Sequence, residues 1–74
     1  MFLHLLPGEM FEHTHNDHSI TMLIEGEVAM EAGGTRSALV QGMPTPVDAH
    51  LPHLLINVGH EVAMVKCVHV RLDQ

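Results

Sequence analysis

The sequence predicts an all-β fold, a small sandwich or barrel, and three observations lead to that prediction. Short apolar segments are separated by turn-forming residues at intervals of roughly 8 to 17 residues, a rhythm typical of all-β domains. No stretch combines an apolar period of 3.6 residues with helix caps, so we expect no helix. The chain has 74 residues, and we expect residues 1–74 to form a single domain.

The first two strands are expected at Phe2–Leu6 and Met10–His15. Pro7-Gly8 separates them, and a proline followed by a glycine favours a turn over either regular element. The chain therefore reverses early, which is the first requirement for an antiparallel arrangement.

The third and fourth strands are expected at Ser19–Ile24 and Glu27–Glu31, with a turn at Glu25-Gly26. Successive side chains of a strand point to opposite faces. In Ser19–Ile24 both faces are mostly apolar, which is typical of a strand that is covered on both sides. In so short a chain we expect a partner subunit to supply the second cover, and we predict a homodimer.

The last four strands are short runs bounded by glycine-containing turns. They are expected at Thr35–Val40, Thr45–Val47, His53–Asn57 and Glu61–Arg71. In the last of these, Ala63, Val65, Cys67 and His69 share one face and alternate with a second, mostly apolar face.

Composition excludes several classes of function. The net charge is −6, with 3 basic against 9 acidic residues, so the chain lacks the basic patch that nucleic acids and anionic membranes require. No apolar run reaches the roughly 20 residues of a membrane span. A lone thiol, Cys67, fits a reducing compartment, and Met1–His4 lacks the basic start of a signal peptide. We therefore expect a cytoplasmic protein.

Histidines carry the strongest functional signal. His13 and His15 flank one residue, and residues two apart in a strand share a face. His50 and His53 follow far downstream. Imidazole is the commonest metal ligand in proteins and is largely unprotonated near neutral pH. Two histidines from one strand and a third from a distant strand would make an open metal site.

Two spaced motifs around these histidines resemble those of the cupin superfamily. In the first, Gly8 is followed after four residues by His13-Thr14-His15, then after three by Ser19, and after six more by Gly26. In the second, Gly42 is followed after five residues by Asp48-Ala49-His50, then after two by His53, and after three more by Asn57. The chain departs from the pattern where Ser19 replaces a metal-binding glutamate, and where Asp48 and His50 replace proline and glycine.

The resemblance implies a small cupin-type β-barrel, that is, a short double-stranded β-helix or jelly roll. It implies that His13, His15 and His53 bind a divalent transition metal: Fe, Mn, Ni, Zn or Cu. Three protein ligands with open positions are a competent catalytic arrangement. By the same resemblance, Asn57 would hydrogen-bond backbone groups near the site.

Other histidines are secondary candidates. His18 precedes Ser19 and would point to the opposite face of a regular strand, unless a bulge turned it inward. His50 stands at a turn position, where a turn residue is the simpler interpretation. His60 is expected to be solvated, and His4 and His69 are assigned no role. Cys67 is interpreted as core filler because no neighbour in sequence lowers its pKa.

The function therefore has three interpretations. The first is a metal-dependent dioxygenase, isomerase or lyase that acts on a small molecule. The second is a binding module without catalysis, and the third is a structural barrel with metal as a folding staple. No tyrosine is present, so a general acid or base would be a histidine or Asp48. The ligand pocket is expected to be lined by Phe11, Ser19, Thr21, Leu23 and Leu55.

Overall fold

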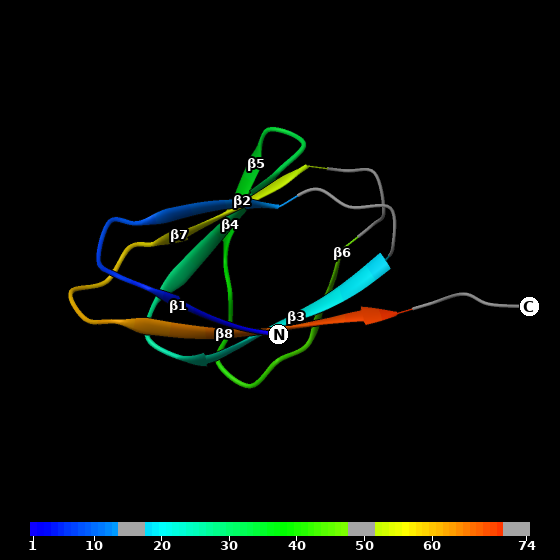
Figure 1. Cartoon of the computed structure of the whole chain (residues 1–74). Coiled ribbons are helices and arrows are strands. Elements are labelled where there is room, and N and C mark those ends of the chain that lie inside the picture. Colours follow the sequence, from blue (N-terminus) through cyan, green and yellow to red (C-terminus); the bar gives the residue numbers. More distant parts are fainter. Residues whose placement is uncertain (14–17, 48–51, 71–74) are drawn as a thin grey trace, which may run out of the picture.

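The computed structural model of the chain describes residues 1–13, 18–47 and 52–70, and it leaves out the side chains of His13, His18 and Val70. Figure 1 shows two layers of antiparallel strands and no helix in this described part. The strands are β1 (Phe2–Leu5), β2 (Met10–His13), β3 (His18–Glu25), β4 (Val28–Ala32), β5 (Thr35–Ala38), β6 (Thr45–Val47), β7 (His53–Asn57) and β8 (Ala63–Val70). The all-β prediction is confirmed.

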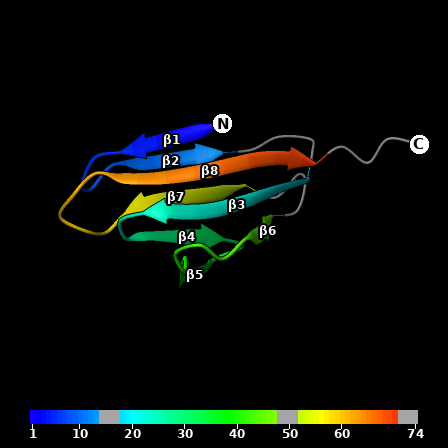
Figure 2. The same cartoon turned by 90° about the horizontal axis from the view of Figure 1, so that it is seen from below.

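Each layer is a four-stranded sheet. Sheet A has the order β1-β8-β3-β6 and sheet B the order β2-β7-β4-β5. Strands that are consecutive in sequence mostly lie in opposite sheets, so the chain passes repeatedly from one layer to the other (Figure 1), and Figure 2 views the two sheets one over the other. This is the double-stranded β-helix, or jelly roll, that the resemblance implied.

The predicted strand bounds hold closely, and the differences have local causes. Thr35–Val40 was expected to be one strand, but β5 ends at Ala38. There the backbone N–H of Leu39 donates to the carbonyl oxygen of Val28, at 2.9 Å, and the chain turns toward sheet A. The last strand begins two residues later than expected because the carbonyl oxygen of Glu61 accepts a side-chain hydrogen bond within the loop.

The core lies between the two sheets and is built by alternation. In β3 and β8 every second side chain is buried against sheet B, and the residues between face outward. The buried cluster consists of Leu5, Leu23, Val28, Leu39, Leu55, Ala63, Val65 and Cys67. Small aliphatic side chains fill it, as expected for a chain without tryptophan or tyrosine.

One glycine is required where β3 leads into β4. Gly26 has a φ of 99°, which side-chain-bearing residues rarely adopt, and a Cβ there would lie 2.7 Å from the Cβ of Ala63. The close approach brings the β3–β4 turn against the start of β8. The turn signal in the sequence therefore also marks a contact between chain segments.

Candidate functional site

The predicted histidines lie at one end of the barrel, which we call the histidine end. Strand β2 ends there at His13 and β7 begins there at His53, and the antiparallel register makes these two residues direct partners. The backbone of His13 is described, and its side chain is not. His15 lies outside the described residues. Two of the three predicted ligand positions thus come together from strands far apart in sequence.

His53 contributes its side chain to the barrel interior. It is buried, with 2% of its surface exposed, and it shares the inner face of β7 with Leu55 and Asn57, which are also buried. A histidine in this position can present a ring nitrogen to a group bound between the sheets. Burial also restricts the orientation of the imidazole ring, so the ring needs little reorganisation when it binds a ligand.

Sheet A contributes Ser19 to the same end. Its side chain is 2% exposed, and its Oγ has no hydrogen-bond partner among the described residues. Buried hydroxyls nearly always have a partner, and an unsatisfied one costs about 1–3 kcal/mol. The Ser19 hydroxyl can both donate and accept a hydrogen bond, and neither bond is made within the described residues. Such a group is suited to bind a ligand. Among the described residues, no group of three metal-binding side chains converges at this end, so a metal there would need His13 and His15 in addition to His53.

Thr21 and Cys67 form the next row inward. They are partners in the β3–β8 ladder, and the hydroxyl oxygen of Thr21 lies 3.9 Å from the sulfur of Cys67. Burial raises the pKa of the Cys67 thiol, against smaller lowering effects of the Thr21 hydrogen bond and the chain N-terminus. The thiol is therefore neutral near pH 7, as expected of a core residue and not of a nucleophile.

The other predicted pocket residues are packed into the core. Leu23 and Leu55 belong to the buried cluster, and Phe11 is partly buried against it. Thr21 is fully buried. These side chains lie on the inner faces, as the alternation predicted, and whether they contact a ligand stays a prediction.

The secondary histidine candidates are placed only in part. His50 lies outside the described residues. His18 begins β3 one residue before the buried Ser19, with Val70 as its partner in β8. The irregularity in β3 lies between Leu23 and Glu25, at the far end of the strand, so the described register has no bulge beside His18.

Sequence reasoning assigned no role to His69, although the structure brings it to this end. Its partner in the β3–β8 ladder is Ser19. Because cross-strand partners share a face and Ser19 points inward, His69 belongs to the inner row as well. Its side chain is exposed because β8 reaches the mouth of the barrel here. The alternation Ala63, Val65, Cys67 was the signal that could have identified it.

Asn57 makes backbone hydrogen bonds, as expected, but not near the histidines. Its Nδ2 donates to the carbonyl oxygens of Leu5 and Glu61, both at 2.8 Å, and its Oδ1 accepts from the N–H of Gly59 at 2.9 Å. Asn57 and His53 are the two ends of β7, which a strand separates by about 13 Å. The prediction that Asn57 bonds near the site is wrong, because it holds the opposite end of the barrel.

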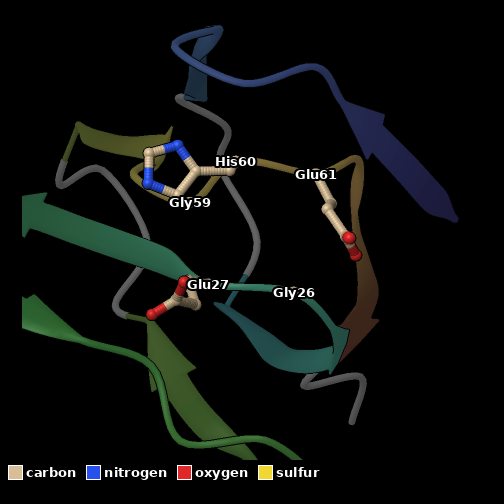
Figure 3. Close-up of a pocket in the computed structure, with 5 residues that line it drawn as sticks. All are labelled: Gly26, Glu27, Gly59, His60 and Glu61. Carbon is tan, nitrogen blue, oxygen red and sulfur yellow. The ribbon is translucent and has the colours of Figure 1, made fainter.

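That opposite end, which we call the asparagine end, has a shallow pocket of about 270 Å³. It is lined by Gly26, Glu27, Gly59, His60 and Glu61. Figure 3 shows the two carboxylates pointing away from each other and from the imidazole ring of His60. Within the described ranges, no three side chains of the metal-binding types converge on one point. The side chains that line this pocket therefore form no such set of three.

No helix within residues 1–13, 18–47 and 52–70 is long and apolar enough to cross a membrane.

Comparisons with known proteins agree with this architecture. The family model for the cupin domain matches residues 1–70. A comparison with curated proteins found no match. Among solved structures, a protein of Thermus thermophilus is similar, with 28% identity and a TM-score of 0.82; the match covers 93% of this chain and 68% of that one.

Two further structures share the fold. A predicted oxalate decarboxylase of Thermotoga maritima is 22% identical with a TM-score of 0.83, and the match covers 96% of this chain and 64% of that one. A de novo designed double-stranded β-helix is 20% identical with a TM-score of 0.78, and the match covers 95% of this chain and 96% of that one. The two natural proteins are thus longer than this chain.

Proposed function

Because this chain belongs to the cupin family, we propose that it binds a divalent transition metal at the histidine end through His13, His15 and His53. The metal would take a small molecule at its open coordination positions. The observation that carries the proposal is the register of β2 and β7, which pairs position 13 with an inward-facing, buried His53.

The ligand chemistry supports a soft or borderline divalent ion. Imidazole suits iron, copper, nickel and zinc, and histidine ligation does not select among them, because geometry and availability decide. When bound, such an ion supplies a Lewis acid at its open positions. Three neutral imidazoles leave its charge uncompensated, so a small molecule with one oxygen or sulfur donor is the class of ligand that we propose.

The chain's own residues restrict the chemistry at this end. At this end the described inner side chains of sheet A are Ser19 and Val47, with His69 at the mouth, and none is a carboxylate. Ser19 can orient a ligand by a hydrogen bond, whereas proton transfer would require a histidine. The reaction classes that fit are dioxygenation, isomerisation and a lyase step, and a binding module without catalysis is the alternative. Oxygen uptake by the iron-loaded protein with candidate substrates separates these two.

Metal content is the direct test of the site. We expect protein purified without an affinity tag to take up about one transition-metal ion per chain, measured by elemental analysis after dialysis. His53→Ala, and His13→Ala combined with His15→Ala, should abolish uptake. His60→Ala is the matched control, because His60 is exposed at the asparagine end. Full uptake by the His53→Ala variant would refute the site.

We also propose that the protein's partner is a second copy, docked through the outer face of sheet A. This face exposes Phe2 by 57%, Ile20 by 37% and Val68 by 44%, with half-buried Met22 and Met64 between them. Its polar members among the described side chains are few: His4 on β1, Lys66 near the middle of the face, and Glu25 at the end of β3. Exposed apolar area of this kind marks an association surface.

Charge favours sheet A over sheet B for this contact. The chain carries a net charge of −6, so two copies repel unless their acidic groups are kept apart. The outer face of sheet B carries two acidic residues, Glu12 and Glu31, the latter paired with Arg36, whereas the outer face of sheet A carries the acidic Glu25 at the end of β3 and the basic Lys66 near its centre. A two-fold dimer through sheet A would place most acidic side chains away from the interface.

Sedimentation equilibrium tests the dimer. We expect twice the chain mass at micromolar concentration, and a single chain mass for Ile20→Glu combined with Val68→Glu. Ala38→Glu is the control, since Ala38 is exposed on β5 of sheet B. A wild-type protein that sediments as a monomer would refute the proposal.

A further inference from the structure

We infer that His69 is a fourth ligand to the metal at the histidine end, supplied by sheet A. This inference rests on the proposed function, since it adds a ligand to that same site. It gives a role to a histidine that the spacing of the sequence motifs does not include.

The ladder between β3 and β8 carries the argument. His69 and Ser19 are direct partners, and the buried side chain of Ser19 fixes which face is inner. Along β8 the residues on the same face, Ala63, Val65 and Cys67, are all buried. His69 is the next position of this row, at the point where the row leaves the core.

The two other proposed ligand positions that the structure describes both lie in sheet B. His13 and His53 are partners in sheet B, and His15 follows β2 by two residues. At this end the described inner row of sheet A consists of Val47, Ser19 and His69. Of these only the imidazole is a strong ligand for a transition metal. A metal held by both sheets would join the two layers where strand pairing does not.

The short side chain of Ser19 is consistent with this arrangement. It fills little of the space beside His69, and its buried Oγ has no partner among the described residues. A hydroxyl in this position can hydrogen-bond to a ligating imidazole or to a metal-bound molecule and orient it. The pairing of a small polar residue with a histidine therefore takes the place of a single long acidic side chain.

Cobalt(II) binding tests the inference without any substrate. Wild-type protein, His69→Ala and His69→Cys are titrated with cobalt(II), with affinities measured by competition with a chelator and spectra recorded in the visible and near ultraviolet. We expect His69→Ala to lower the cobalt affinity about tenfold or more and to change the ligand-field bands. His69→Cys should add a thiolate-to-cobalt charge-transfer band that the wild-type protein lacks.

His4→Ala is the matched control, because His4 is also an exposed strand histidine but lies on the outer face of β1. His69 is exposed, so its substitution leaves the packed core intact, and thermal unfolding of the metal-free variants verifies this. Unchanged affinity and spectrum in His69→Ala, with no new band in His69→Cys, would overturn the inference alone. Absence of cobalt binding by the wild-type protein would overturn the proposed function with it.

Discussion

The two ends of the barrel differ in whether their buried polar side chains are hydrogen-bonded within the described residues. At the asparagine end, Asn57 makes three hydrogen bonds to backbone groups of β1 and of the loop before β8. At the histidine end, Ser19 is equally buried, and its hydroxyl has no partner in the described part of the chain. The first arrangement favours stability, and the second leaves bonding capacity for a ligand. Active sites commonly give up stability in this way.

Of the substitutions considered, removal of the Asn57 side chain should lower the free energy of unfolding most. Asn57→Ala leaves three backbone groups without their partner, and we expect the free energy of unfolding to fall by about 3 kcal/mol or more. A chain of this size has only about 4–11 kcal/mol in total, so the loss should be visible in urea unfolding. Asn57→Asp keeps the acceptor for Gly59 but sets a carboxylate oxygen against the carbonyl oxygens of Leu5 and Glu61, so near neutral pH its loss should be at least as large. Wild-type stability of Asn57→Ala would show that the asparagine end does not depend on this network.

Substitution of Gly26, which lies close to Ala63, should give the second largest loss of stability. Gly26→Ala places a Cβ against Ala63 and requires an unfavourable φ, and we expect a loss of about 2 kcal/mol in thermal unfolding. Gly8→Ala is the matched comparison, since Gly8 has a φ of 81° with no atom within 4 Å of the added Cβ. It should lose about 1 kcal/mol, from the backbone alone. Equal losses would mean that the Ala63 contact adds nothing.

Substitution of Ser19 should not lower the stability of the metal-free protein, in contrast to substitution of Asn57. Ser19→Ala removes a buried hydroxyl without a described partner, and we expect the metal-free protein to be unchanged or stabilised by up to about 1 kcal/mol. Thr21→Val is the control, because its hydroxyl lies beside the sulfur of Cys67 and its removal should not stabilise. Chemical unfolding of both variants measures the difference. A clear destabilisation by Ser19→Ala would contradict the contrast between the ends.

The smallest expected effect is a loss of stability at high pH from Cys67. Its pKa is raised by burial, so the folded protein retains the thiol proton at pH values where the unfolded chain, with an ordinary value of 9.0, has lost it. Its contribution is therefore constant below pH 9 and declines as pH rises above it. The melting temperature followed across this range should fall more steeply for wild type than for Cys67→Ala. Parallel curves would show that the thiol plays no part.

Much of the fold was accessible from local patterns. Thr45–Val47 and His53–Asn57 were predicted at their observed bounds, because short β-branched and aliphatic runs end at clear turn residues. The predicted inner face of β3, with Ser19, Thr21 and Leu23, is buried. Asn57 was predicted to bond backbone groups, but its location relative to His53 was not foreseen. Residues close in sequence motifs were taken to be close in space, and a strand separates them.

By itself the sequence determined the element types, the turns and which side chains of a strand share a face, because a period of two and glycine conformational preferences act locally. It also predicted that histidines from the two motifs share a site; the structure pairs position 13 with His53, and the shared site itself stays a prediction. Only the tertiary structure decided which strands pair and in what register. That pairing placed His69 opposite Ser19, which does not follow from spacing along the chain, since strand partners are chosen by packing of the two sheets. The separation of Asn57 from His53, by contrast, already follows from the predicted strand that joins them.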